Sequence, residues 1–136
     1  MEIEEQILNT YHTVCVVGLS NNPDRPSYTV ARYLQSNGYR IIPVNPNEPR
    51  ILEETSYPNV TSVPDPIEVV DIFRRSEDVL PIVVEAIKAK AKVIWMQEGV
   101  KNDEAAEYAR KAGLLVVMDK CMSKEHIRIK ENSWRK

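Results

Sequence analysis

The chain is poor in the features that mark secreted, membrane-spanning or metal-binding proteins. Its 136 residues include two cysteines, Cys15 and Cys121, which are too few for a disulfide scaffold and lack the paired spacing of a zinc site. No apolar run approaches the ~20 residues of a transmembrane helix. The acidic N-terminal segment MEIEEQILNTY has no apolar core of the kind that a signal peptide needs. These absences predict a protein of the reducing cytoplasm.

An excess of either charge is also missing. The 18 Lys and Arg residues nearly balance the 20 Asp and Glu residues, so the net charge is −2, and we expect no global attraction to nucleic acid or to a membrane surface. Apolar residues make up 43% and charged residues 28%, as in ordinary globular proteins. The length suits one compact domain, which we expect to span residues 1–136.

Glycine is scarce, with four in the chain, and their wide spacing argues against glycine-rich phosphate loops. The first apolar run ends at Gly18, and the following turn reads G-L-S-N-N-P. The dinucleotide fingerprint G-x-G-x-x-G needs glycine where Ser20 and Pro23 stand, and Asn45 replaces its ribose-binding acid. A Walker loop is missing too, which argues against a P-loop ATPase. An NAD(P)-dependent oxidoreductase is disfavoured but stays an alternative.

Apolar runs alternate with segments of helical period along the chain. Continuous apolar runs are typical of buried parallel strands, here Thr13–Gly18, Tyr39–Val44, Glu68–Phe73, Lys92–Met96 and Leu114–Met118. The predicted helices are Glu4–Thr10, Ser27–Gly38, Ser76 (as N-cap) to about Lys90, Asp103–Ala112 (capped by Asn102) and Lys124–Ile129. Segment Ile51–Pro66 predicts a loop with one short helical turn. The alternation predicts a three-layer α/β fold, Rossmann-like, with a five-stranded parallel sheet in the order 3-2-1-4-5.

Ligands of open parallel sheets bind beyond the carboxyl ends of the strands. The residues placed there are Gly18–Ser20, Val44–Pro46, Phe73–Arg75, Met96–Gly99 and Asp119–Met122. They supply hydroxyl and amide donors, one aromatic ring and, with Arg25 in the first loop, three guanidinium groups, which match phosphate geometry. We therefore expect a nucleotide-like ligand with several phosphates and an adenine ring.

Five motifs in this order resemble the small stand-alone CoA-binding proteins: VVGLSNNPDRPSY, GYRIIPVNP, VVDIFRR, VIWMQEGV and VVMDKCMSKEH. These proteins are in turn similar to the CoA-binding domain of the succinyl-CoA synthetase α subunit. The resemblance covers about Tyr11–Arg128. It implies a Rossmann-like sheet that holds coenzyme A or an acyl-CoA at its carboxyl edge, without catalysis. The synthetase needs a phosphohistidine on a further domain, so ligase activity is not implied.

The resemblance also implies which residues contact the cofactor. They are Gly18, Leu19, Ser20, Asn21, Arg25, Ser27, Val44, Asn45, Pro46, Phe73, Arg74, Arg75, Gln97, Gly99 and Val100. The first turn would lie near the pyrophosphate, with Arg25 and Ser27 adding phosphate contacts. Phe73 and Arg74 would flank the adenosine, and the segment after the fourth strand would follow the pantetheine. The synthetase's Pro-Gly-Lys element lacks its lysine here, so the partner of the 3′-phosphate stays open.

Cys121 carries a further alternative. The thiol follows the last strand, near His126 in the sequence, and is either a buried structural cysteine, which we favour, or a thiolate activated by cationic neighbours. In the second case the protein is a redox or regulatory protein that forms a CoA mixed disulfide at Cys121. No Ser/His/Asp arrangement or carboxylate pair stands out, so no catalytic residue and no metal site are expected.

Overall fold

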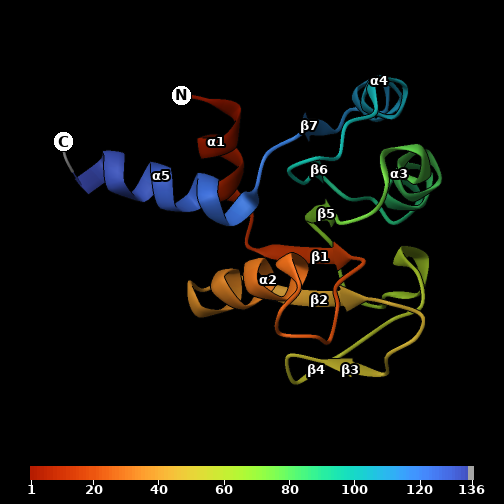
Figure 1. Cartoon of the computed structure of the whole chain (residues 1–136). Helices are drawn as coiled ribbons and strands as arrows, with labels where there is room; N and C mark the ends of the chain where they lie inside the picture. Colours follow the sequence, from red (N-terminus) through yellow and green to blue (C-terminus); the bar gives the residue numbers. More distant parts are fainter. Residues whose placement is uncertain (135–136) are drawn as a thin grey trace.

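A five-stranded parallel sheet forms the centre of the computed structural model, which describes residues 1–134 (Figure 1). The strands are β1 (Thr13–Val17), β2 (Arg40–Val44), β5 (Val69–Ile72), β6 (Val93–Met96) and β7 (Leu115–Val117). Nearly all of their residues are buried, as strands covered on both faces require. The predicted class, a Rossmann-like α/β fold with a five-stranded parallel sheet, is confirmed.

Helices cover both faces of this sheet (Figure 1). One face carries α1 (Ile3–Thr10), α2 (Pro26–Ser36) and α5 (Met122–Trp134), and the other carries α3 (Val79–Lys88) and α4 (Asp103–Lys111). On β1, Val14 and Val16 pack toward α1, α2 and α5, whereas Cys15 and Val17 pack toward α3 and α4. Successive side chains of a strand point to opposite faces, so one sheet serves two apolar clusters.

The predicted strand order is wrong. The observed order is β2-β1-β5-β6-β7, which places the third strand of the sheet, β5, beside β1, whereas the predicted order placed it outside β2. The chain leaves β2 at the edge of the sheet and crosses β1 before it enters β5. The direction in which the strands are added therefore reverses between β1 and β5, and this reversal is the switch point at which such sheets bind ligands.

The connection from β2 to β5 contains a small hairpin within the segment predicted as a loop. Strands β3 (Arg50–Ile51) and β4 (Glu54–Thr55) pair antiparallel. Leu52 and Glu53 join them, with φ values of 54° and 65°. Asn-Gly pairs normally signal such a turn, and their absence explains why the hairpin was missed. The predicted short helical turn is present as η1 (Val60–Ser62).

One of the predicted helix ends is observed, and two others differ in the structure. Asn102 caps α4, since its Oδ1 accepts the amide three residues later at 2.9 Å. Ser76 is not the N-cap of α3; it opens the 3₁₀ turn η2 (Ser76–Asp78), and its Oγ accepts the amide of Lys101 at 3.0 Å. Helix α5 is longer than the predicted Lys124–Ile129. None of the helices in residues 1–134 has the length and apolar character to cross a membrane.

Candidate functional site

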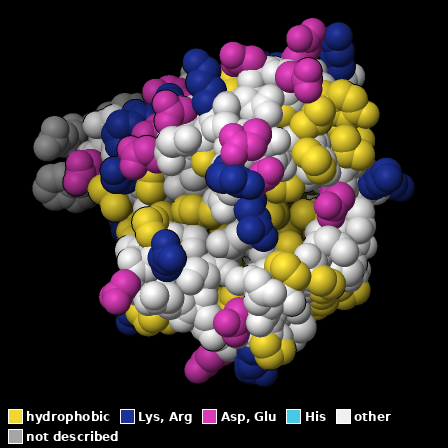
Figure 2. Space-filling model, turned by 45° about the vertical axis from the view of Figure 1, so that its right-hand side comes forward, with side chains coloured by type: hydrophobic (Ala, Val, Ile, Leu, Met, Phe, Trp, Pro, Cys, Tyr) yellow, Lys and Arg dark blue, Asp and Glu magenta, His cyan; other side chains and the backbone are white. Residues whose placement is uncertain are grey.

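A cleft of about 1120 Å³ opens at the carboxyl edge of the sheet, at the switch point between β1 and β5. Figure 2 turns this edge forward and shows apolar atoms in a hollow, with charged side chains of both signs around it. Gly18 follows β1, and its amide donates to the carbonyl of Val44 at 2.9 Å. Phe73 follows β5, and its amide donates to the carbonyl of Val17 at 2.9 Å. The turn after β1 is thus fixed between the ends of β2 and β5.

Two features require glycine at position 18. Its φ is +87°, and a Cβ there would overlap the carbonyl oxygen of Phe73 and lie 3.4 Å from Nε of Arg74. The other three glycines also have positive φ, but a Cβ on any of them would meet nothing within 4 Å. Without a side chain, Gly18 lets the turn after β1 approach the end of β5 closely, which brings the segments that carry Ser20 and Arg74 to one cleft.

The polar loop between β1 and α2 is ordered by its own side chains. The amide of Ser20 donates to Oγ of Ser27 at 2.9 Å, and Oγ of Ser20 accepts the amide of Asn22 at 3.0 Å. Oδ1 of Asn22 accepts the amide of Asp24 at 2.9 Å. Such local bonds fix a loop that lacks further glycine. Arg25 then stands at the N-cap, with proline at the first helical position, so the positive end of α2 lines the cleft.

The cations around the cleft are of two kinds. Nε of Arg75 lies 3.2 Å from Oδ2 of Asp78, and Nζ of Lys124 lies 2.9 Å from a glutamate oxygen. Arg25 and Arg74 have no acidic partner within residues 1–134. Their guanidinium groups are free to bind an anion, and their planar forks suit phosphate oxygens.

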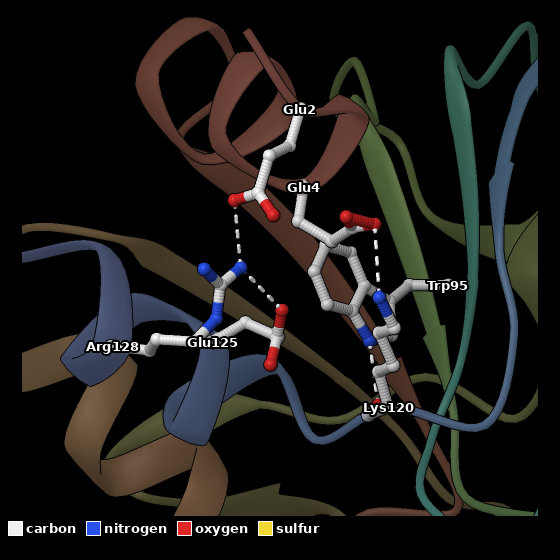
Figure 3. Close-up of polar contacts among 6 residues, drawn as sticks. All are labelled: Glu2, Glu4, Trp95, Lys120, Glu125 and Arg128. Carbon is white, nitrogen blue, oxygen red and sulfur yellow. Dashed lines mark hydrogen bonds and ion pairs between the residues drawn. The ribbon is translucent and has the colours of Figure 1, made fainter. Parts of the chain in front are cut away.

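The inner wall of the cleft comes from the segments after β6 and β7. Gln97 is 4% exposed, and its Oε1 accepts the first amide of α5 at 3.0 Å, which leaves its side-chain NH₂ as a donor. Trp95 donates from Nε1 to the carbonyl of Lys120 at 2.8 Å, and Nζ of Lys120 lies 3.4 Å from Oε2 of Glu4 (Figure 3). These contacts hold the segment that carries Cys121.

Cys121 lines the cleft but is only 7% exposed. Its Sγ lies 3.3 Å from Oγ of Ser123. His126 is engaged elsewhere: its Nδ1 lies 2.7 Å from the hydroxyl of Tyr33, and its ring packs edge-on against Tyr33 and Tyr39. Burial lowers the pKa of His126. This histidine lines a separate cavity of about 880 Å³ beside α1, α2 and α5, which contains none of the predicted site residues.

The cleft gathers most of the residues predicted from the sequence. Those that line it are Gly18, Ser20, Arg25, Ser27, Phe73, Arg74, Arg75, Gln97, Val100 and Cys121. The predicted residues outside its lining are Leu19, Asn21, Val44, Asn45, Pro46 and Gly99. Leu19 and Val44 are buried in the apolar clusters. Contact of the lining residues with a cofactor stays a prediction.

Three of the predicted residues outside the lining support the turns around the cleft. Nδ2 of Asn45 donates to the carbonyl of Leu19 at 2.9 Å, which ties the end of β2 to the turn after β1. Nδ2 of Asn21 lies 3.4 Å from Oε2 of Glu48. The amide of Gly99 donates to Oδ1 of Asp119 at 2.7 Å. The side-chain amides of Asn45 and Asn21 and the backbone amide of Gly99 therefore already donate hydrogen bonds within the protein.

Sequence reasoning did not name the remaining lining residues as contacts, although it placed Glu98 at this edge within Met96–Gly99. These residues are Asp24, Pro26, Thr29, Val30, Asp78, Glu98, Ser123 and Lys124. Three of them lie in the first turns of α2, at positions i, i+3 and i+4 from Pro26. That spacing defines one face of a helix, so the signal was present once the helix was predicted. Ser123 and Lys124 belong to the first turn of α5, whose start was predicted two residues too late.

Comparison with known proteins gives a consistent assignment. The family model described as CoA binding domain matches residues 12–127. The uncharacterized protein YneT of Bacillus subtilis (strain 168) is 38% identical over 125 residues, which cover 92% of each chain. A solved structure, a hypothetical protein from Pyrococcus horikoshii OT3, has a TM-score of 0.89 and 41% identity, over 92% of this chain and 88% of the other.

A larger enzyme shares one part of its length with this chain. The acetate–CoA ligase (ADP-forming) II of Archaeoglobus fulgidus is 29% identical over 104 residues, which are 73% of this chain and 16% of the ligase. The resemblance suggested by the five motifs is therefore confirmed by the family match. Because that match spans most of its length, the chain belongs to the CoA binding domain family.

Proposed function

We propose that this protein binds coenzyme A or an acyl-CoA in the cleft at the carboxyl edge of the sheet without catalytic turnover. The observation that carries the proposal is a pair of arginines, Arg25 and Arg74, beside the close approach of Gly18 to Phe73; neither arginine has an acidic partner within residues 1–134. Membership of the CoA binding domain family supports it. We further propose that residues 1–136 act as one such domain.

The chemistry of the cleft fits the parts of this ligand. Coenzyme A carries a pyrophosphate and a 3′-phosphate on an adenosine. The guanidinium groups of Arg25 and Arg74, with the positive end of α2, offer these phosphates charge-assisted hydrogen bonds. Phe73 offers an apolar ring at the same mouth. Gln97, Val100 and Cys121 line the cleft beyond these groups, where the uncharged pantetheine arm would lie.

Binding without turnover is supported by where the reactive side chains lie. His126 is bonded to Tyr33, and His12 stacks on Tyr39 with ring centroids 5.0 Å apart. Neither histidine is among the residues that line the cleft. The acids Asp78 and Glu98 are paired with cations. Within the described residues, the cleft thus holds no base bonded to a nucleophile, which acyl transfer requires. The family match also favours this role over an NAD(P)-dependent oxidoreductase.

Isothermal titration calorimetry with CoA and with dephospho-CoA tests the proposal. We expect heat with CoA, and a loss of about 1.5–3 kcal/mol for Arg74→Ala, which is about 10- to 150-fold in Kd, because a hydrogen bond to a charged group is lost. Arg110→Ala is the matched control, because Arg110 is exposed on α4 and outside the cleft, and it should bind like the wild type. If Arg74 holds the 3′-phosphate, the Arg74→Ala variant should bind CoA and dephospho-CoA with equal affinity. No heat from either ligand would refute the proposal.

A further inference from the structure

A buried acid that the proposed binding does not use lies under the cleft. Asp71 is in the middle of β5, opposite Val16 on β1 and Trp95 on β6. Its side chain is fully buried, and neither carboxyl oxygen has a hydrogen-bond partner in the described chain. Burial raises the pKa of this carboxyl well above 3.8, with Cys121 as a further cause. Burial therefore favours the neutral form of Asp71, and a buried carboxyl with no hydrogen-bond partner within residues 1–134 needs an explanation.

Asp71 faces the side of the sheet on which Cys121 lies. Strand side chains alternate, so Asp71 points the same way as Val69 and Phe73, two residues before and after it. Both pack in the apolar cluster that contains Cys121, and Phe73 and Cys121 both line the cleft. Asp71 thus lies on the same side of the sheet as Cys121, close enough for Cys121 to influence its pKa, and away from the face that Cys15 occupies.

We propose that Cys121 is a thiol–disulfide exchange site for the ligand of this cleft, with Asp71 as a positioning residue behind it. The inference rests on the proposed function, since the arginines must hold a thiol-bearing ligand in the same cleft. Within residues 1–134 the carboxyl of Asp71 has no hydrogen-bond partner. In the proposed exchange its partner is the sulfur of Cys121, once that thiol has become a thiolate. A neutral carboxyl does not repel that thiolate and can donate a hydrogen bond to it.

The co-reactant is the symmetrical disulfide of CoA, so the exchange needs no further oxidant. The Cys121 thiol gives its proton to solvent, and its sulfur attacks one sulfur of the disulfide. The S–S bond between the two CoA halves breaks, and a new S–S bond joins Cys121 to one of them. The other half leaves as a thiolate and takes a proton from solvent. Cys121 is oxidised, and the departing half is reduced.

Intact-mass spectrometry of the full chain incubated with CoA disulfide tests the site. We expect one CoA adduct on the wild type and on Cys15→Ser, and none on Cys121→Ser. Cys15 is the matched control because it is fully buried on the opposite face, where burial raises its pKa to about 12. Glutathione disulfide, which has no nucleotide, should react at least tenfold more slowly, and Arg74→Ala should slow the CoA reaction alone. No adduct, an adduct on Cys15, or equal rates with the two disulfides would overturn the site.

Two variants test the role of Asp71 separately from its role in packing. Asp71→Leu removes the donor but suits an apolar site, so it should melt no lower than the wild type while it forms the adduct at least tenfold more slowly. Asp71→Asn keeps an N–H donor and should retain most of the rate. Equal adduct rates in Asp71→Leu and the wild type would overturn the role of Asp71. Calorimetry with reduced CoA separates the two proposals. If Cys121→Ser binds CoA with heat but forms no adduct, the binding function stands whatever the role of Cys121. If the wild type itself gives no heat, the binding function is refuted.

Discussion

Replacement of Gly18 by alanine tests whether the close approach of β1 and β5 holds this cleft together. A Cβ at this position overlaps the carbonyl oxygen of Phe73 and lies 3.2 Å from its carbonyl carbon. Backbone cannot give way as a flexible side chain can, so the two strand ends must separate. That movement strains the hydrogen bond from the amide of Phe73 to the carbonyl of Val17. Gly113→Ala is the matched control, with φ +91° and open space around its Cβ.

The magnitude follows from the two contributions. A left-handed backbone costs alanine about 1–2 kcal/mol, and this applies to both variants. Overlap at Gly18 adds about 1–3 kcal/mol, as overpacking does elsewhere. With a urea m-value of about 2 kcal/mol/M, the unfolding midpoint should fall by about 0.5–1 M for Gly113→Ala and about 1–2.5 M for Gly18→Ala. Urea unfolding followed by circular dichroism measures both midpoints. Equal midpoints in the two variants would refute the reasoning.

Substitutions at three other positions test the stability of the fold. Burial raises the pKa of Asp71 above 3.8, so the wild type should lose up to about 1.4 kcal/mol of unfolding free energy per pH unit as the pH rises from about 4, whereas Asp71→Asn should not. Urea unfolding from pH 4 to 7 gives the slope of unfolding free energy against pH for each protein. Equal slopes would contradict this prediction. Asn102→Ala removes the cap of α4 and should lower the unfolding free energy by about 1 kcal/mol in urea. Glu68→Ala should cost about 1–3 kcal/mol, because Oε1 accepts the amides of His12 and Thr13 at 2.9 and 3.0 Å; Glu68→Gln, which keeps an acceptor, should cost less in the same assay.

The class of fold could be predicted because it depends on local patterns. Each strand of the sheet is a short apolar run, and each helix buries one apolar stripe, so periodicity alone identifies the elements. The hairpin of β3 and β4 could not be predicted in this way. Its turn places Leu52 and Glu53 at positive φ, which neither residue favours by itself. Contacts made elsewhere in the fold hold that turn, such as the bond from Gln35 Nε2 to the carbonyl of Leu52 at 3.2 Å.

Part of the cleft could also be predicted, because local patterns mark the ends of the strands. Residues at strand ends, such as Gly18, Phe73 and Gln97, could be predicted as site residues because ligands of parallel sheets bind at the carboxyl edge that all the strands share. Asp71 was passed over because it stands inside an apolar run, and the sequence does not show that its carboxyl lacks hydrogen-bond partners. The role of Asn45 in holding the carbonyl of Leu19 depends on the distance between two loops, which no local pattern encodes.

The strand order shows how a single residue could have corrected the topology. In the order 3-2-1-4-5, β2 is an interior strand, paired on both sides. Pro43 in the middle of β2 has no N–H to give, and proline is confined to edge strands and bulges. The observed order puts β2 at the edge of the sheet, where Tyr57 adds a single bridge at Val44 and donates from its amide to the carbonyl of Pro43 at 3.0 Å.

The topology also decides the composition of the site. With the predicted order, the segment after β5 would lie beyond β2, two strands away from Gly18, and Arg74 could not share a cleft with Arg25. Because β5 pairs with β1 instead, the ends of these strands are neighbours, and Gly18 lies against Phe73. Arg25 and Arg74, which have no acidic partner within residues 1–134, then line one cleft from opposite sides of the switch point. The phosphate binding that we propose for these arginines, in a chain with one glycine in its first turn, therefore depends on the strand order.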